Sequence, residues 1–173
     1  MNTLSMERKK IIIRRYEAPC GPLVLGSVDG RLVLCDWLEG GSHERVVSGL
    51  HRRLDAGFEE GTTPLLETAT TQLDEYFVGW RKGFDIPVLN IGTNFQRQVW
   101  KAINAIPYGM TITYGQLARK IGRPSSVRAV ANATGANPMS ILTPCHRVVG
   151  TDGLLTGYGG GLLVKEFLLK LES

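Results

Sequence analysis

A cysteine followed directly by a histidine lies in the C-terminal part of the sequence, at Cys145-His146, just after Pro144. A thiolate is a strong nucleophile, and an adjacent imidazole can deprotonate a thiol directly or through one water molecule. Pro144 has a fixed φ angle and disfavours a helical residue before it, so the approach to Cys145 is predicted to be rigid. The alternative is a buried structural cysteine beside an incidental histidine, because free cysteines are usually buried and inert. The pair alone leaves both interpretations open.

The surroundings of the pair favour the reactive cysteine. Segment 144–149 (PCHRVV), with Asn137-Pro138 before it and segment 157–161 (GYGGG) after it, resembles the O6-alkylguanine-DNA alkyltransferases, which are methylated-DNA–protein-cysteine methyltransferases. The likeness covers residues 93–173 in order and spacing, while residues 1–92 match only in general layout. It implies DNA repair by direct damage reversal. An alkyl group would move irreversibly and stoichiometrically from guanine O6 to Cys145, with thymine O4 as a second candidate source.

The resemblance also implies roles for residues that support the cysteine. It places Glu172 against His146, so that a relay from glutamate through histidine and water deprotonates the thiol. Tyr114 is implied to donate toward N3 of the leaving guanine, and Asn137 to act as a hinge. Glu166 is a competing carboxylate that we expect at the surface. The candidate catalytic residues are therefore Cys145, His146, Glu172, Tyr114 and Asn137.

A glycine-rich segment after the cysteine is expected to form the substrate pocket. The resemblance implies that Tyr158 stacks along the extruded base, and glycines allow backbone amides to approach the ring. Relatives with a proline near position 140 or a side chain at position 159 have tighter walls, whereas this chain has Ser140 and Gly159. The accepted alkyl size therefore stays open. The candidate pocket residues are Val148, Tyr158, Gly159, Gly160 and Ser140.

The expected product is a thioether, which neither water nor a thiol readily releases, so each molecule should act once. The sequence contains no Gly-Lys-Ser/Thr phosphate-binding motif, and the reaction requires no cofactor.

Charge is distributed unevenly along the chain. Residues 1–92 contain 11 Lys/Arg and 13 Asp/Glu, a net charge of −2, and residues 93–173 contain 9 Lys/Arg and 3 Asp/Glu, a net charge of +6. A basic half suits a DNA phosphate backbone, although a merely soluble surface is the alternative for charge alone. Most of the excess comes from Arg97, Lys101, Arg119, Lys120, Arg123, Arg128 and Arg147.

A helix-turn-helix is predicted within the basic half. Thr113 is expected to cap a helix over residues 114–121, and Ser125 to cap a second helix ending at Ala133, after a turn at residues 122–124. We expect Val127, Val130, Ala131 and Thr134 to face inward on the second helix. The outer face would then carry Arg128, Ala129, Asn132 and Ala133.

Small outer residues would let the second helix approach the narrow minor groove, where little base information is available. The resemblance implies that Arg128 enters the duplex and fills the gap left by the extruded base; a plain phosphate contact is the alternative. The candidate DNA-binding residues are Arg128, Ala129, Ser125, Arg123 and Thr113.

The remaining patterns predict an α/β (α+β) N-terminal domain at residues 1–92 and a mainly helical C-terminal domain at residues 93–173. The first would contain a small antiparallel sheet with helices, and the second a winged helix-turn-helix-like motif. Strands are predicted near residues 11–13, 23–25 and 32–34, with a hairpin turn at Asp29-Gly30 and an edge strand at 86–89. Helices are predicted at 44–54, 64–78, 94–105 and 162–171, and a strand is expected to carry Cys145.

Composition fits a compact globular protein of 173 residues, with 43% hydrophobic and 21% charged residues. No segment approaches the roughly 20 apolar residues of a membrane span, and residues 1–10 lack the apolar core of a signal peptide. Three cysteines without Cys-x-x-Cys spacing argue for a reducing compartment, the cytoplasm or, in a eukaryote, the nucleus. A zinc site from Cys20, Cys35, His43 and His51 is an alternative, but its spacing matches no structural-zinc pattern, and no metal is expected.

We expect a monomer that binds double-stranded DNA and alkylated guanine, but no membrane. Two other function classes are alternatives to alkyl transfer. A cysteine hydrolase using Cys145 and His146 would require an oxyanion hole and a substrate cleft. A non-catalytic regulator that binds DNA lesions would keep the helix-turn-helix but lack a reactive cysteine, and Cys145 is present.

Overall fold

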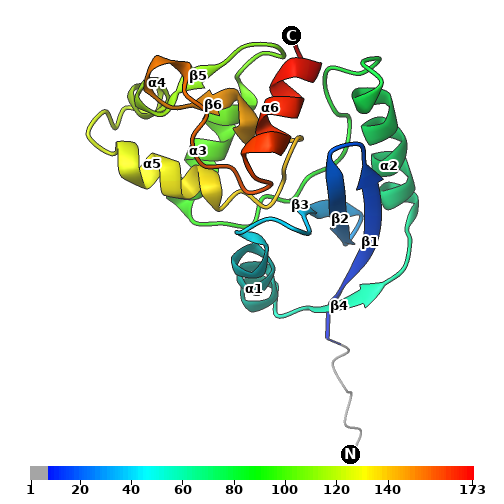
Figure 1. Ribbon diagram of the computed structural model, residues 1–173. Coiled ribbons are helices and arrows are strands. Elements are labelled where there is room, and N and C mark those ends of the chain that lie inside the picture. Colours follow the sequence, from blue (N-terminus) through cyan, green and yellow to red (C-terminus); the bar gives the residue numbers. More distant parts are fainter. Residues whose placement is uncertain (1–7) are drawn as a thin grey trace, which may run out of the picture.

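The computed structural model describes residues 8–173, so most of the polar segment 1–10, whose composition argued against a signal peptide, lies outside the described residues. Two parts lie side by side: a four-stranded sheet with helices α1 and α2, and a mainly helical part containing α3 to α6 (Figure 1). The predicted α+β fold class is confirmed, and a domain boundary at residue 92 stays a prediction. No helix within residues 8–173 is long and apolar enough to cross a membrane.

The sheet is mixed rather than antiparallel. Its strands are β1 (Lys10–Ala18), β2 (Gly21–Val28), β3 (Arg31–Trp37) and β4 (Gly57–Glu60), in the order β3-β2-β1-β4. The first three are antiparallel neighbours, but β4 pairs in parallel with β1. Strand β4 was not predicted because its sequence, Gly-Phe-Glu-Glu, contains one large apolar residue and no alternation.

The predicted hairpin between β2 and β3 is confirmed. Val28 pairs with Arg31 across the two-residue turn, in which Asp29 and Gly30 have φ angles of 49° and 71°. Left-handed values at both positions match the right-handed twist of the flanking strands, and Asp-Gly tolerates them well.

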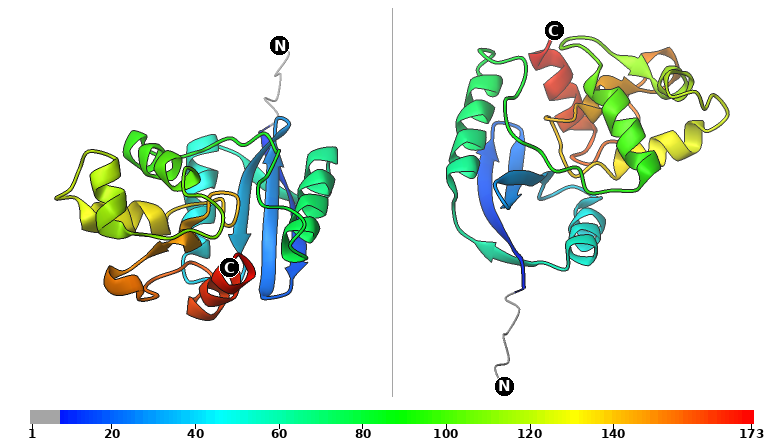
Figure 2. Two further views of the ribbon diagram at one scale, coloured as in Figure 1. Left: turned by 90° about the horizontal axis from the view of Figure 1, so that it is seen from above. Right: turned by 180° about the vertical axis from the view of Figure 1, so that it is seen from behind.

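Helices α1 (His43–Leu54) and α2 (Pro64–Phe77) cover opposite faces of the sheet, as the view from above shows (Figure 2). Val46 and Leu50 of α1 pack in one core cluster, while Leu66 and Leu73 of α2 pack in another. Both helices end within one residue of the predicted positions, and the hydroxyl of Thr63 accepts from the backbone N–H of Leu66 at the start of α2.

The mainly helical part contains α3 (Asn94–Asn104), β5 (Ile112–Thr113), α4 (Tyr114–Lys120), α5 (Val127–Gly135) and α6 (Leu162–Leu171). Capping boxes begin both α3 and α4, with Thr93 paired to Gln96 and Thr113 paired to Gln116. Helices α4 and α5 form the predicted helix-turn-helix, and Val99 of α3 lies buried in the same core as Leu117 and Val130.

Three details predicted for α5 are wrong. The helix begins at Val127 after Ser126, and neither the predicted cap Ser125 nor Ser126 makes a side-chain cap bond, because the Ser126 N–H closes a turn onto the Arg123 carbonyl. Ala133 is buried rather than outward, since α3 packs there and the Trp100 indole donates to the Ala133 carbonyl. Val127 is 38% exposed instead of inward.

The cysteine does not lie on a strand, as the sequence had suggested. Cys145–Arg147 form a 3₁₀ turn, and the strand β6 (Val148–Val149) begins only afterwards, parallel to β5. A second 3₁₀ turn spans Thr151–Gly153. The predicted edge strand at 86–89 is reduced to one bridge between Val88 and Leu32, where Pro87 contributes its carbonyl to the N–H of Leu32.

The outer edge of β3 joins the sheet to the segment that precedes the cysteine. The Cys35 N–H donates to the Pro138 carbonyl at 2.9 Å, and the Ser140 N–H donates to the Cys35 carbonyl at 2.7 Å. These bonds place residues 138–140 alongside β3. The first part of the fold therefore fixes the position of the chain that leads to Cys145.

Candidate active site

A cavity of about 740 Å³ lies where α5, the segment before Cys145, the loop before α6 and the β3–α1 connection meet. The structure brings many of the predicted site residues to it from separate parts of the sequence. Those that line the cavity are Tyr114, Arg128, Asn137, Ser140, Cys145, Tyr158 and Gly159.

The thiol of Cys145 faces this cavity but is only 7% exposed. Burial raises the pKa of the thiol, while a hydrogen bond from Asn137 and the charge of Lys165 act in the opposite direction. The net pKa is raised, so the group is protonated at neutral pH and requires a base before it can attack.

Asn137 holds the chain on both sides of its own turn. Its amide nitrogen lies 3.3 Å from Sγ of Cys145 and donates to the Thr143 carbonyl at 3.0 Å, and its carbonyl oxygen accepts from the Met139 N–H at 2.9 Å. This buried side chain therefore connects the end of α5 to the cysteine, which fits the predicted hinge.

His146 and Glu172 meet behind the cysteine. Nε2 of His146 lies 2.8 Å from Oε1 of Glu172, and both side chains are almost fully buried. Burial lowers the pKa of His146, although the nearby carboxylate opposes the shift, so the imidazole is neutral at neutral pH. Within residues 8–173, the other nitrogen, Nδ1, has no hydrogen-bond partner. A neutral ring that donates from Nε2 keeps Nδ1 able to accept a proton.

Glu172 is the centre of a larger buried polar cluster. Arg147 donates to its carboxylate from Nε at 2.8 Å and from Nη2 at 3.0 Å, and the Tyr76 hydroxyl donates at 2.7 Å. Burial alone would raise the pKa of Glu172, but hydrogen bonds from His146, Arg147 and Tyr76 outweigh it and the pKa is lowered. The group is therefore a carboxylate at any physiological pH.

The prediction for Arg147 is wrong. Its charge was counted among the basic residues expected to face the DNA backbone. The side chain is buried, and its remaining terminal nitrogen donates to the Ile106 carbonyl at 2.7 Å. Its charge neutralises Glu172 and does not reach a phosphate. Glu166, the competing carboxylate, lies at the surface as expected and pairs with Lys170.

Tyr114 lies across the cavity with its ring 5.9 Å from Nζ of Lys165. Its hydroxyl makes only long contacts of 3.5 Å with the carbonyls of Thr156 and Gly157. Burial raises the pKa of Tyr114, so it stays a phenol that can donate a hydrogen bond.

Lys165 was not among the site residues predicted from the sequence. Its fully buried ammonium donates to the Val148 carbonyl at 2.6 Å and to the Thr156 carbonyl at 3.0 Å, which ties the pocket loop to β6. Burial lowers its pKa to about 8. Lys165, Leu168 and Glu172 are spaced so that they lie on one face of an apolar helix. That spacing could have identified Lys165 as a buried lysine.

The pocket loop is supported by the N-terminal part. The indole of Trp37 donates to the Tyr158 hydroxyl at 3.0 Å. A Cβ added to Gly159 would lie 2.8 Å from Oγ of Ser42, so a side chain there would have to displace that serine. Gly160 packs against the Trp37 ring, and Val148 is fully buried, so neither of these predicted pocket residues lines the cavity.

Asp36 is a second polar residue at the site that was not predicted from the sequence. It is 2% exposed, lines the cavity with Cys145, and its carboxylate lies 2.8 Å from Nδ1 of His43. Burial raises the pKa of Asp36, and the contact with His43 opposes the shift. The signal was an aspartate inside an otherwise apolar strand. The predicted scaffold thus contributes a polar group to the site.

Four of the five predicted DNA-binding residues are exposed on α5 or in the turn before it, and Thr113 is half-buried at the start of α4. Arg128 is exposed at the margin of the cavity, and Ala129 is exposed one residue further along α5. Arg123 lies 5.6 Å from the ring of Phe95, and Ser125 is exposed in the turn. Thr113 caps α4.

Comparisons with known proteins point to one family. Residues 94–173 match the model of the 6-O-methylguanine DNA methyltransferase DNA-binding domain. The chain is 42% identical to the methylated-DNA–protein-cysteine methyltransferase of Methanosarcina acetivorans, covering 91% of this chain and 96% of the relative. It is 39% identical to the Shigella flexneri protein of the same name, covering 95% and 96%.

Solved structures are similar over nearly the whole fold. A crystal structure of Mycobacterium tuberculosis O6-methylguanine methyltransferase has a TM-score of 0.79 at 40% identity, covering 94% of this chain and 92% of the other. A structure of M. tuberculosis OGT in complex with DNA also has a TM-score of 0.79, at 41% identity with 92% and 91% covered. From its sequence, its fold and its buried Cys-His-Glu arrangement, the chain belongs to the methylated-DNA–protein-cysteine methyltransferase family.

Proposed function

We propose that this protein repairs DNA by transferring a methyl or other alkyl group from O6 of guanine to Sγ of Cys145, irreversibly and once per molecule. The observation that carries the proposal is a buried cysteine at the cavity surface, with His146 and the ionised Glu172 directly behind it. The cavity also borders the exposed face of α5, so an extruded base can enter it from a bound duplex.

The reaction begins with removal of the thiol proton. Nδ1 of His146 accepts this proton through a water molecule, and Glu172 stabilises the imidazolium that forms. The sulfur then attacks the alkyl carbon, an S–C bond forms, and the C–O6 bond breaks with its electron pair going to guanine. Tyr114 donates a hydrogen bond or proton to guanine N3 and so stabilises the leaving base. Asn137 keeps the cysteine oriented.

We propose that the protein binds double-stranded DNA as a monomer and that α5 enters the minor groove. Arg128 then replaces the extruded nucleotide in the base stack. Thr113, Arg123, Ser125 and Ala129 would contact the backbone or groove nearby. Val148 and Gly160 support the pocket from behind, whereas Tyr158, Gly159 and Ser140 face the base and its alkyl group. Three observations support a cytoplasmic location: the proposed substrate is genomic DNA, the cysteines of residues 8–173 form no disulfide, and the relatives come from archaea and bacteria.

Incubation of the protein with a duplex containing one O6-methylguanine, followed by mass spectrometry, tests the proposal. We expect a gain of one methyl group on the peptide that contains Cys145. Tight binding without any gain in mass would favour a non-catalytic regulator. Repeated turnover of an ester or amide would favour a hydrolase, and methylation of Cys20 or Cys35 would move the nucleophile elsewhere.

Arg128→Ala should weaken repair of duplex DNA more than reaction with free O6-benzylguanine. Only the duplex requires something to fill the vacated position, and losing about 1.4 kcal/mol of that interaction would reduce the duplex rate about tenfold. Single-turnover rates on both substrates measure the difference, with Arg31→Ala as a control at an exposed arginine of the N-terminal part. Equal losses on both substrates would instead place Arg128 in folding or chemistry.

Lys165→Gln should move the acidic limb of the pH–rate profile to higher pH. The ammonium lowers the pKa of Cys145, so its removal reduces the thiolate fraction while glutamine can still donate to the neighbouring carbonyls. Because the pKa of Lys165 is about 8, the difference from wild type should be largest below that pH and fade above it. Single-turnover rates across pH measure it, with the exposed Lys170→Gln as control. A uniform loss at all pH values would contradict the electrostatic effect.

A further inference from the structure

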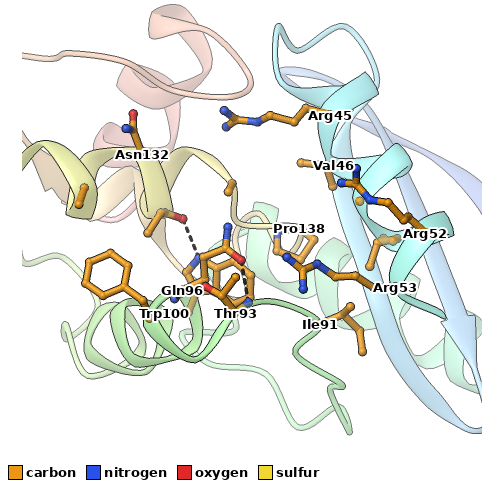
Figure 3. A pocket seen from close by; sticks show the side chains of 16 residues that line it. Arg45, Val46, Arg52, Arg53, Ile91, Thr93, Gln96, Trp100, Asn132 and Pro138 are labelled. Atoms are coloured by element: carbon orange, nitrogen blue, oxygen red, sulfur yellow. Dashed lines mark hydrogen bonds between the residues drawn. The ribbon is translucent and has the colours of Figure 1, made fainter.

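A groove of about 560 Å³ runs between α1 of the N-terminal part and helices α3 and α5 (Figure 3). Three arginines of α1 line one wall, namely Arg45, Arg52 and Arg53. Figure 3 shows their side chains reaching from α1 into the space opposite Asn132 and Gln96. The groove is distinct from the cavity that contains Cys145.

The arrangement follows from the sequence of α1. Arg45, Arg52 and Arg53 are seven and eight positions apart, which places them on one side of a helix. Val46 and Leu50 are buried against the sheet. The helix is therefore amphipathic, and its exposed side concentrates positive charge along the groove.

The three groove arginines are unpaired within the part of the chain that the structure describes. Across residues 8–173, neither hydrogen bonds nor ion pairs join the three guanidinium groups to other side chains. Of the five other arginines in residues 8–92, all but Arg31 bond to another side chain. Arg8, for example, binds Asp55 just after α1, and Arg81 binds Glu75. All three groove arginines are exposed. Their charge is thus available to an anionic partner.

The opposite wall belongs to the DNA-binding part. Ala129 and Asn132 of α5 line the groove and are exposed. Arg45 lines both the groove and the Cys145 cavity, and its Nη2 would lie 3.6 Å from a Cβ added to Gly135 near the end of α5. The groove is therefore adjacent to the cavity that would receive the extruded base, and Arg45 belongs to the wall of both.

We propose that this arginine groove binds the phosphodiester backbone of the DNA strand that flanks the alkylated nucleotide, so that α1 is part of the DNA-binding surface. The inference rests on the proposed function, because it places the duplex against α5. The eight residue steps of helix from Arg45 to Arg53 rise about 12 Å, which is the axial length of about three nucleotide steps. Guanidinium groups match phosphate oxygens in charge and geometry, so three arginines suit three successive phosphates.

The salt dependence of DNA binding tests this surface. Each phosphate contact contributes about 0.9 to the slope of log K against log salt concentration on duplex DNA. In a Cys145→Ser background, combined Arg45→Gln, Arg52→Gln and Arg53→Gln should reduce the magnitude of the slope by about 2 to 3. Fluorescence anisotropy with a labelled duplex containing one O6-methylguanine measures it at several NaCl concentrations.

A matched control removes the same three charges elsewhere. The control variant combines Arg14→Gln in β1, Lys82→Gln after α2 and Lys170→Gln in α6. None of these three residues lines the groove. The control should leave the slope nearly unchanged. An equal reduction in both triple variants would mean that net charge alone is responsible, and an unchanged slope in the groove variant would also overturn the proposal.

The reaction with free O6-benzylguanine separates this inference from the proposed function. With Cys145 present, the double variant Arg52→Gln, Arg53→Gln, which keeps Arg45 at the Cys145 cavity, should react with the free base at the wild-type rate and melt at the wild-type temperature. Slower reaction with the free base would assign the arginines to folding or chemistry and overturn the proposal. If wild type transferred no alkyl group, the proposed function would fail, while the difference in salt slope would still report on the groove.

An acidic surface of a second protein copy is the competing partner for these arginines. On a duplex that accommodates one molecule, loss of affinity in the groove variant supports contact with DNA. Unchanged affinity on that duplex, with weaker binding only on a duplex that accommodates several molecules, would assign the groove to a neighbouring protein and overturn the proposal.

Discussion

Replacing Cys145 with serine should abolish alkyl transfer and leave DNA affinity close to that of wild type. A serine hydroxyl is far less acidic than a thiol, and removal of a nucleophile commonly costs a thousandfold or more, so we expect a loss of at least about 10³ in rate. Affinity should persist because α4 and α5 form a surface separate from the 3₁₀ turn that carries the cysteine. Single-turnover transfer and equilibrium binding to the same duplex measure the two effects.

Cys20→Ser is the matched control, since Cys20 is partly exposed and lies outside the cavity. It should retain transfer. If Cys145→Ser lost binding and transfer to the same extent, the nucleophile and the DNA surface would not be separate parts of the molecule. Burial raises the pKa of Cys20 to about 11, so its thiol also cannot compensate for the missing nucleophile at neutral pH.

Glu172→Gln should have the second large effect, on both stability and rate. A neutral amide leaves the buried guanidinium of Arg147 without its counter-charge, and breaking a buried ion pair costs about 3–5 kcal/mol of unfolding free energy. The same change removes the carboxylate that stabilises the His146 imidazolium, so thiol deprotonation should slow at neutral pH. Thermal or denaturant unfolding measures the first effect, and single-turnover transfer measures the second.

The pH dependence of the variant distinguishes these contributions. The folded protein lowers the pKa of Glu172, so its stabilising contribution is complete above the usual glutamate range and is lost as pH falls through that range toward the lowered value. Wild type and variant should therefore converge in stability in acid. Raising the pH should restore part of the variant's transfer rate, because solvent can then deprotonate the thiol.

Glu166→Gln is the control for the glutamate variant. Its carboxylate lies at the surface and pairs only with Lys170, so stability and rate should stay close to wild type. Superimposable pH–rate profiles for wild type and Glu172→Gln would remove Glu172 from the deprotonation step and leave it as a purely structural group.

Local signals in the sequence predicted most of the elements. Asp29-Gly30 specified the hairpin, Thr63 and Thr113 marked helix starts, and apolar periodicity placed the helices within about two residues. The failures were also local in origin. Ser125 is a good capping residue by type, but the turn closed by the Ser126 N–H delays the helix. Cys145 follows a proline and precedes two valines, yet forms a 3₁₀ turn instead of a strand.

The site was predictable in part because its central motif is compact in sequence. Resemblance supplied Glu172 as the partner of His146, and periodicity alone could not have selected it. Arg147 was assigned to the DNA surface because charge patterns do not reveal burial. The contacts of Tyr76 with Glu172 and of Trp37 with Tyr158 join residues 96 and 121 positions apart. Such pairs arise from tertiary packing and leave no local pattern.

The position of Glu172 in the chain has a consequence for protein synthesis. Tyr76, Gly109, His146 and Arg147, which surround its carboxylate, all precede it by 25 to 96 residues. Helix α6 also supplies Leu168 to the core on the α2 side of the sheet. Ribosomes add about 5–20 residues per second, so the 27 positions from Cys145 to Glu172 correspond to a delay of about 1–5 s. On the proposed mechanism, the relay that activates Cys145 is complete only after α6 has packed, so the nascent chain does not carry out alkyl transfer through this relay until Glu172 is in place.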